Sequence, residues 1–570
     1  MPISTGISLD YADFLNYHGA QGGTMFARVK RSGTYQYLQL VENRWESGRT
    51  HQRVIATLGR LDQMTQKGEV ESLVRSLSRF TEKTFLILSD KSKVSASAKK
   101  IGPVLIFERL WKELGIGPLL SSLVSSRKFG FSVERALFLT VLHRLFVSGS
   151  DRGCDTWRRN YVIPGTEKIA LHHLYRAMAF LGEELDDQTD RTPFAPRCTK
   201  DVIEEQMFDY RRSLFTDLDL VFLDTTSLYF EGEGGQTIGE RGHSKDHRPD
   251  LNQMVVGALL DDHGRPLACE MWPGNTADVK SVVPVVTRLK KRFGASHFCL
   301  VADRGMISKD TIRELDKEQV SYILGVRMRL VKEVKTEVLL DDSVYEEIYP
   351  ELAQSKAPAP LKVKEVTVNG TRYIVCHNER QARKDEADRT AIVAALKEKL
   401  AKAPSSLVGN KGYRTFLTVS KEGVALDEEK IKADARFDGI WVLTTNTKLP
   451  ARDLALKYKE LWMVEHTFRD MKSVIDTRPI FHKRDETIRG HVFCSFLALA
   501  LKKELGDRLA SHGLQFEWAE IKQDLKALQE VTLEENGSTL AVRTECQGVC
   551  GKVFKAVGVA VPPTIRVMGK

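Results

Sequence analysis

The chain has 570 residues, of which 42% are hydrophobic and 28% are charged. This composition argues against gross disorder, and the length exceeds what one hydrophobic core supports, so we expect several domains. The net charge of +9 comes from 85 basic and 76 acidic residues, which permits an anionic partner without identifying one.

Cysteine usage and the apolar segments indicate the compartment. Eight cysteines are scattered along the chain without an obvious metal-binding framework, which is typical of a reducing cytosol. The opening stretch MPISTGISLDYADF lacks a basic region followed by an apolar run, so no signal peptide is expected. The most apolar stretch, GHVFCSFLALALKKEL, is too short to span a bilayer and is interpreted as a buried helix. We therefore expect a cytoplasmic protein with no membrane contact.

The first part of the chain, residues 1–64, is predicted to be a small basic β-rich region. Alternating residues over 25–60, divided by the turn signals RSGTYQ and ESGRTH, predict three short strands. One face of this sheet is rich in arginine and lysine. That face is either a solvated surface or a surface that touches nucleic acid, and both interpretations stay open.

Residues 65–200 are predicted to form a helical domain. The stretches VLIFERLWKELGIGPLLSSL and FSVERALFLTVLHRLFVSGS place apolar residues at helical spacing. The polar, proline-containing stretch DQTDRTPFAPRC predicts a boundary at the end of this region.

A mixed α/β pattern follows. Residues 215–327 predict the order β-β-β-α-β-α-β, and the charged residues 328–436 predict a β-rich insertion. The sheet resumes at GIWVLTTN within residues 437–505 and passes into a helix that carries YKELWMVEHTFRDMK. Residues 506–570 are predicted to be a C-terminal helical tail.

Two acidic residues stand at unusual places in apolar strands. Asp224 interrupts VFLDTTS and Asp303 ends CLVADRG. A charge in a buried strand is costly unless it is paired or binds a metal, and each residue alone is as readily structural as functional. The predicted strand order can bring the two side by side, and Glu465 can supply a third carboxylate from a helix packed on the sheet. Such a set suits two Mg²⁺ ions about 3.5–4 Å apart that promote phosphodiester cleavage and strand transfer.

The helix that carries Glu465 has a second regularity. Tyr458, Glu465 and Lys472 are spaced by seven residues, which is about two turns, so on a single helix all three point the same way. This face is either solvated or forms one wall of an active site.

FLDTTS, VADRG and Y-x6-E-x6-K, in this order, resemble the DDE transposases of bacterial insertion sequences. The closer resemblance is to the branch with a ribonuclease H-like core, a β-rich insertion and a Tyr-Arg-Glu-Lys signature. It implies an α/β fold class, with a ribonuclease H-like mixed sheet preceded by a small β region and a helical DNA-binding domain. It also implies that Asp224, Asp303 and Glu465 are catalytic and bind Mg²⁺ or Mn²⁺, and that Tyr458 and Lys472 contact phosphates of the transposon end.

The chain departs from this signature at one position. Leu461 stands where the signature has arginine, and Arg469, after Glu465 on the same predicted helix, is a candidate replacement cation. Further candidates for DNA binding are Arg304, which follows Asp303, and the basic residues of the loop GERGHSKDHRPDLNQ, namely Arg241, Lys245 and Arg248.

The resemblance implies a function and its partners. The protein would bind the terminal inverted repeats of a transposon in double-stranded DNA, cut the ends, and join the 3′-hydroxyls to target DNA at the bacterial nucleoid. A homodimer is expected in the synaptic complex. Two alternatives stay open: a metal-dependent nuclease that cuts without joining, and an inactive relic that only binds DNA.

Overall fold

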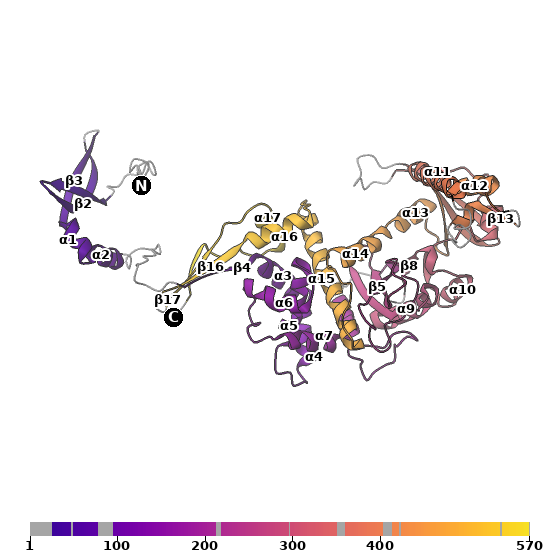
Figure 1. Cartoon of the computed structure of the whole chain (residues 1–570), viewed down its shortest axis with the longest axis horizontal. Coiled ribbons are helices and arrows are strands. Elements are labelled where there is room, and N and C mark those ends of the chain that lie inside the picture. Colours follow the sequence, from indigo (N-terminus) through magenta and orange to yellow (C-terminus); the bar gives the residue numbers. More distant parts are fainter. Residues whose placement is uncertain are drawn as a thin grey trace. The chain divides into compact units, whose positions relative to one another are not determined.

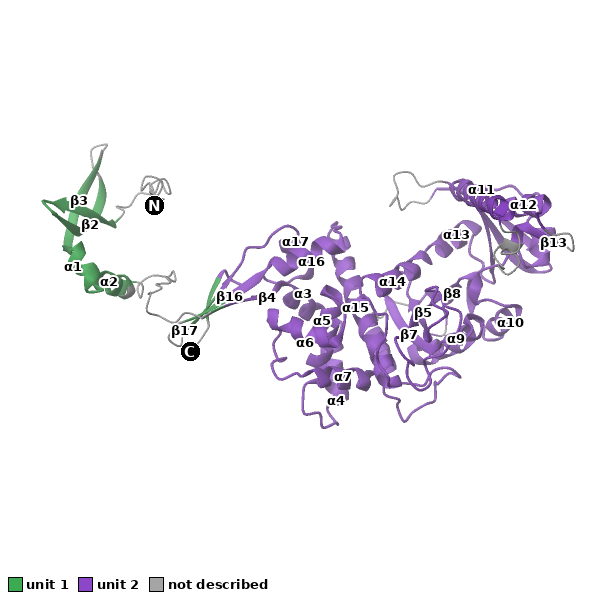
Figure 2. Cartoon of the chain, viewed as in Figure 1, with its two compact units in different colours: residues 1–96, 532–541, 565–570 green, residues 97–531, 542–564 purple. Residues whose placement is uncertain are grey.

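The computed structural model describes residues 25–46, 49–77, 95–211, 218–295, 297–349, 360–402, 413–420, 423–535 and 538–568. The chain divides into two units (Figure 2). One comprises residues 1–96, 532–541 and 565–570, and the other comprises residues 97–531 and 542–564.

The N-terminal strands form as their alternation predicts. An antiparallel sheet has the order β1-β2-β3, and two helices follow it. The bounds are β1 (Met25–Ser32), β2 (Tyr35–Glu46), β3 (Arg49–Arg60), α1 (Leu61–Gln66) and α2 (Glu69–Leu77). Val41 in the central strand is fully buried, whereas most residues of β1 and β3 are exposed or half-buried.

The region up to residue 211 is mostly helical, with one short strand at its start that the periodicity did not predict. Ser132 begins the most buried of these helices, because its hydroxyl accepts a hydrogen bond from the Arg135 amide over 3.2 Å. The elements are β4 (Ser95–Lys100), α3 (Gly102–Glu113), α4 (Ile116–Val124), α5 (Val133–Phe146), α6 (Asp151–Trp157), η3 (Arg158–Asn160), α7 (Leu171–Gly182) and α8 (Thr199–Arg211).

The larger unit contains a mixed sheet of nine strands, in the order β10-β11-β12-β15-β9-β8-β5-β6-β7, which lies on one side of helix α15 (Figure 1). Its first part has the predicted β-β-β-α-β-α-β order. The elements are β5 (Leu220–Tyr229), β6 (Gln253–Leu260), β7 (Pro266–Pro273), α9 (Asp278–Phe293), β8 (Cys299–Ala302), η4 (Arg304–Met306), α10 (Lys309–Lys317) and β9 (Ser321–Gly325). Strands β5, β8 and β9 are parallel neighbours, whereas β6 pairs antiparallel with both β5 and β7.

The segment predicted as a β-rich insertion contains strands and also a long helix. Strands β10 to β12 extend the central sheet, because β12 pairs with β15. The 24-residue helix α11 was not predicted, since it is polar on nearly all sides and buries only Leu396. The elements are η5 (Val334–Val338), β10 (Glu346–Ile348), β11 (Leu361–Val368), β12 (Thr371–Asn378), α11 (Glu379–Lys402), η7 (Tyr413–Phe416), β13 (Leu417–Ser420), β14 (Gly423–Leu426) and α12 (Glu428–Ala435).

The prediction of one helix from Tyr458 to Lys472 is wrong. After β15 (Ile440–Thr445) the chain forms α13 (Ala451–Lys459) and then a separate α14 (Trp462–Ser473). Between the two helices, backbone hydrogen bonds join residues three apart instead of four apart. The Leu461 amide donates to the Tyr458 carbonyl, and the Met463 amide donates to the Glu460 carbonyl. This three-residue spacing interrupts the regular α-helix, so Tyr458 does not share a helix with Glu465 and Lys472.

The apolar stretch after α14 forms the buried helix that was predicted. Helix α15 (Asp485–Ser511) packs against α5, α7 and α14 (Figure 1). No helix among the described residues is long and apolar enough to span a bilayer. The remaining elements are α16 (Trp518–Ala527), β16 (Gln529–Glu535), β17 (Ser538–Arg543), α17 (Cys550–Val557) and β18 (Ile565–Met568), and a four-stranded sheet has the order β18-β17-β16-β4.

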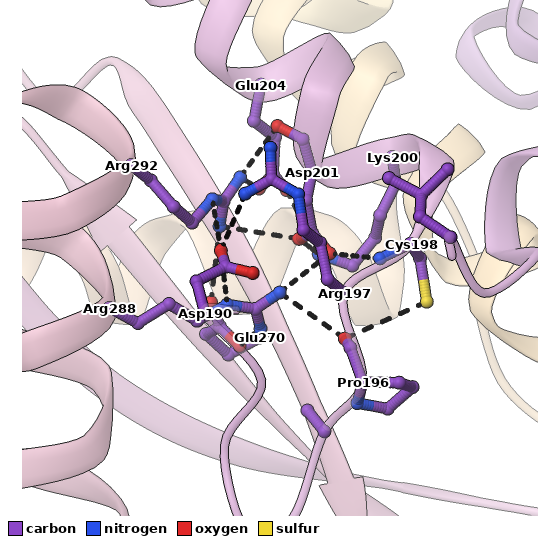
Figure 3. Close-up of polar contacts among 12 residues, drawn as sticks. Asp190, Pro196, Arg197, Cys198, Lys200, Asp201, Glu204, Glu270, Arg288 and Arg292 are labelled. Carbon is purple, nitrogen blue, oxygen red and sulfur yellow. Dashed lines mark hydrogen bonds and ion pairs between the residues drawn. The ribbon is translucent and has the colours of Figure 1, made fainter. Parts of the chain in front are cut away.

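A buried ionic network joins α8, α9 and β7 (Figure 3). Arg288 on α9 pairs with Glu270 of β7 and with Asp201 of α8, each over 2.7 Å. Arg292, one turn later, pairs with Glu204 over 2.6 Å, and the other oxygen of Glu204 accepts a hydrogen bond from the Cys269 amide of β7. These charges satisfy one another, so the network fixes α8 and α9 on β7, the edge strand of the sheet.

Candidate active site

Two aspartates lie at adjoining positions on parallel strands. Strand β5 is buried from Leu220 to Leu228 except at Asp224, which is half-buried. Leu223 pairs with Ala302 of β8, so the next residues along the two strands are Asp224 and Asp303. The sequence prediction that the strand order brings these acids together therefore agrees with the register.

The environment of Asp224 disfavours its charge. Burial raises the pKa of Asp224 to about 6, and the charge of Asp303 adds to the increase. Lys245 and a hydrogen bond of 2.7 Å from the Thr225 amide act in the opposite direction. A buried carboxylate beside a second carboxylate is a place where a bound cation is favoured.

Tyr458 belongs to the same cluster. Its hydroxyl donates a hydrogen bond to Oδ1 of Asp303 over 3.1 Å. Burial raises the pKa of the Tyr458 hydroxyl above its usual range, and the charges of Asp303 and Asp224 raise it further. The hydroxyl therefore stays protonated and orients Asp303, which gives Tyr458 a role that its spacing from Glu465 did not reveal.

Gly325 makes room for this hydroxyl. Ala302 pairs with Leu324 of β9, which places Gly325 beside Asp303 on the third parallel strand. A Cβ atom on Gly325 would lie 2.5 Å from the Tyr458 hydroxyl oxygen and 2.9 Å from the Arg304 amide. The close approach of α13 to the strand ends thus requires glycine here.

Lys245 reaches the acids from the loop between β5 and β6. Its Nζ lies 2.7 Å from both the carbonyl and the hydroxyl of Thr225, and 3.3 Å from a carboxylate oxygen of Asp278. Sequence reasoning predicted Lys245 and missed Asp278, because an acid in the first turn of a helix is expected for electrostatic reasons alone. The two residues form an ion pair beside Asp224.

Asp246, which sequence reasoning also missed, holds two cations. Its carboxylate accepts hydrogen bonds from Lys472 and from Arg478, each over 2.8 Å. Burial opposes ionisation, but these two bonds hold the pKa of Asp246 below its usual range. Lys472 was predicted to contact phosphate, and in this structure its ammonium group is bound to Asp246.

Glu465 stands apart from the two aspartates. It lies on the exposed face of α14, whose opposite face buries Val464, Phe468 and Met471, and the helix contacts β5 and β6. Asp224, Asp303 and Glu465, all three of them described, do not bring carboxylate oxygens within 4.8 Å of one another. Arg469 is exposed on the same helix, whereas Leu461, at the signature's arginine position, is 7% exposed and packs in the core.

The other predicted cations differ in what surrounds them. Arg304 is exposed, and its charge acts on the Tyr458 hydroxyl. Arg248 pairs with Asp250 over 2.9 Å, and the exposed Arg241 lies near enough to lower the pKa of Asp250. Of the loop's predicted basic residues, Lys245 and Arg248 are therefore already paired with acids.

The donor set at the strand ends fits a divalent cation of the Mg²⁺ type. Asp224 and Asp303 offer hard oxygen ligands, and neither is consumed by an ion pair with arginine or lysine among the described residues. A different cluster, Asp151, His482 and His491, brings three ligand-type atoms within 4.8 Å of one another. There, however, Arg144 lies 2.9 Å from Nδ1 of His491, and the Nε2 of that histidine faces the Thr477 carbonyl at 3.0 Å. The lone pair of His491 that could bind a metal faces the Arg144 guanidinium instead, so hydrogen bonds hold this cluster together.

Two family models match the chain. One, described as a transposase DDE domain, matches residues 216–501, which is half of the chain and includes Asp224, Asp303 and Glu465. The other, described as the N-terminal domain of IS1634 family transposases, matches residues 27–91. No curated protein matches the chain.

Proposed function

Because this chain belongs to the DDE transposases of insertion sequences, we propose that it excises its element and inserts it elsewhere. The reaction of the family is DNA transposition, a nucleotidyl transfer on DNA. The finer proposal is that the protein binds the terminal inverted repeats, hydrolyses the phosphodiester bonds at the ends, and joins the freed 3′-hydroxyls to target DNA. We further propose that two copies hold the two ends together, and that the protein acts at the nucleoid.

The observation that carries this proposal is the pair of strand-end aspartates with Tyr458 bound to one of them. We propose that Asp224, Asp303 and Glu465 hold the metal, Mg²⁺ or Mn²⁺, with Glu465 approaching when DNA and metal are present. When bound, such ions activate the attacking oxygen and stabilise the leaving oxygen. Tyr458 holds Asp303 in one orientation, and Lys245 favours the ionised form of Asp224.

The basic residues around the cluster are proposed to hold the DNA backbone. Arg241, Arg248, Arg304 and Arg469 stand at exposed or half-buried positions. Lys472 exchanges Asp246 for a phosphate oxygen of the transposon end in this proposal. Phosphate contacts of this kind position DNA without reading its sequence.

An end-cleavage assay tests the proposal. The substrate is a plasmid that carries the DNA flanking the reading frame on both sides, incubated with the protein in Mg²⁺. Asp224→Ala and Glu465→Gln are expected to bind this DNA as the unaltered protein does and to lose cleavage, because each removes a ligand. Undiminished cleavage by either variant would falsify the assigned roles.

A strand-transfer assay, run beside the cleavage assay with pre-cut ends and a second plasmid, separates the alternatives. A nuclease without transfer cuts the ends but does not join pre-cut ends to a second plasmid. A relic binds the flanking DNA and cuts nothing, even without substitutions.

A further inference from the structure

A cavity adjoins the ends of the strands that carry the two aspartates. Its volume is about 250 Å³, far more than the roughly 15 Å³ that one water molecule needs. Thr226 and Ser227, which follow Asp224 on β5, form one part of its wall. Gly305, two residues after Asp303, forms another part. Open α/β sheets bind their ligands at the carboxyl ends of the strands, so this cavity is placed to hold part of a substrate that reacts at the acids.

A lysine and an arginine line the cavity, and they differ in how far their N–H groups are used. Lys245 donates to the carbonyl and the hydroxyl of Thr225 and pairs with Asp278, so all three N–H groups of its ammonium have partners. Arg327, two residues beyond the end of β9, makes no ion pair with any described residue. Arg327 is therefore the cation that remains available to an anion in the cavity.

The backbone that follows Asp303 holds Arg327 in place. Its Nε donates to the Arg304 carbonyl over 3.0 Å, and its Nη2 donates to the Gly305 carbonyl over 2.7 Å. A guanidinium has five N–H groups, and those not used in these two bonds have no partner among the described residues. A side chain that is already ordered loses little freedom when it binds, and a guanidinium can donate to two oxygens of one phosphate. Arg327 is thus prepared for a phosphate group.

The position of Arg327 also answers the departure from the family signature. Leu461 stands where the signature has arginine, and its side chain packs in the core. Arg469, the replacement that the sequence suggested, is a described residue of α14 and is not part of the wall of this cavity. Arg327 is instead bound to the two residues that directly follow Asp303. The structure therefore supplies a guanidinium beside the acids from a different element of the fold.

We propose that the cavity holds a phosphodiester group of the DNA end, next to the bond that is cut, and that Arg327 binds this group in place of the signature's arginine. The hydroxyls of Thr226 and Ser227 on the wall offer further donors of the kind that contact DNA phosphates. This inference rests on the proposed function in one respect, that DNA is the substrate. It adds the cavity and the residue that hold the phosphate beside the acids.

The first measurement is the salt dependence of DNA binding. Fluorescence anisotropy, in EDTA, follows binding to a duplex of the DNA that flanks the reading frame. Arg327→Ala removes one phosphate contact and is expected to lower the slope of log K against log salt by about 0.9, whereas Arg327→Lys keeps the charge and the slope. Arg329→Ala is the matched control and should leave the slope unchanged. Arg329 is also an exposed arginine, but it pairs with Asp434 over 2.9 Å and does not line the cavity.

The second measurement separates binding of DNA from support of Asp303. Single-turnover cleavage in Mg²⁺, with the protein in excess, is expected to slow about a hundredfold in Arg327→Ala. Arg327→Lys should slow it at least about tenfold, because an ammonium lacks the paired N–H groups of a guanidinium. The Mn²⁺ affinity without DNA, measured by calorimetry, should change less than about twofold, since Asp303 keeps its bond with Tyr458. Arg469→Ala should slow cleavage less than Arg327→Ala does.

The outcomes are distinct. An unchanged salt slope in Arg327→Ala, or an equal change in Arg329→Ala, overturns the inference and leaves the end-cleavage result untouched. A fall in Mn²⁺ affinity as large as the fall in cleavage also overturns it, because Arg327 then acts by supporting Asp303. A larger loss of cleavage in Arg469→Ala returns the role to Arg469. If the unaltered protein binds the flanking DNA without cutting it, the salt slopes still decide the inference, and a protein that does not bind this DNA overturns the proposed function as well.

Discussion

Tyr458 and Asp303 are joined by a hydrogen bond of 3.1 Å, although 155 residues separate them in the chain. We predict that Tyr458→Phe weakens divalent-metal binding about tenfold, because groups that orient a ligand typically contribute that much to affinity. Calorimetric titration of the protein with Mn²⁺ measures the change. Tyr349→Phe is the control, since among the described residues that hydroxyl makes only a long contact of 3.4 Å with Glu347. An unchanged Mn²⁺ affinity would show that the bond does not orient a ligand.

Asp224 is predicted to make stability depend on pH. Its pKa is about 6 in the folded chain against an ordinary value of 3.8. Between these values the folded state binds a proton that the unfolded chain has released, so the free energy of unfolding falls as pH rises through this window. Asp224→Asn is therefore expected to be more stable than the unaltered protein at pH 7, by up to about 3 kcal/mol, with little difference near pH 4.

Urea unfolding in EDTA at both pH values measures this difference. Asp310→Asn, on an exposed helix position with one exposed ion pair, is the control. A stability difference that stays constant between the two pH values would contradict the prediction.

Asp246 is predicted to restrain the affinity for DNA. Its carboxylate binds both Lys472 and Arg478, so Asp246→Asn releases two cations at once. We expect tighter binding to duplex DNA at low salt, and a slope of log K against log salt that steepens by up to about 0.9 for each released cation. Asp250→Asn, which releases only Arg248, should steepen the slope by about half as much. Unchanged slopes in both variants would mean that these cations do not reach phosphates.

The buried ionic network is predicted to be a large contributor to stability. Arg288→Met removes the closest ion-pair partner of Glu270 and one of the three cations that face Asp201, and breaking a buried pair in this way costs about 3–5 kcal/mol. Thermal and urea unfolding measure the loss. Arg313→Met is the matched control, because that arginine is 70% exposed and its ion pair should contribute less than about 1 kcal/mol. Adding Glu270→Gln to Arg288→Met should restore part of the loss, and a further loss would contradict the account.

The two aspartates were visible in the sequence because each breaks or ends an apolar run. The strand order was also predictable, since β-β-β-α-β-α-β follows from alternation and turn signals. These features depend on local patterns, and parallel pairing of β5 with β8 then places Asp224 and Asp303 together. The break between α13 and α14 was not predictable, because the residues from Tyr458 to Lys472 include neither glycine nor proline.

Long-range partners were equally invisible. Asp246 lies in a loop whose sequence is rich in basic residues, and the residues that it binds are more than 200 positions away in the chain. Asp278 reads as an ordinary first-turn acid, and only the structure shows that it faces Lys245. Sequence patterns thus locate charges on elements, whereas the pairing of those charges depends on tertiary packing.

The chain segment that contains α11 and α12 begins and ends at neighbouring positions on the central sheet. The Asn378 amide, at the end of β12, donates a hydrogen bond of 2.9 Å to the Gly439 carbonyl just before β15. A tight hairpin turn can therefore replace residues 379–438 without unpairing a strand, whereas removing β12 as well would leave β15 as a bare, aggregation-prone edge. The chain thus contains a natural excision point for a miniaturised enzyme, and comparing the shortened protein with the full chain would show what the helical excursion contributes.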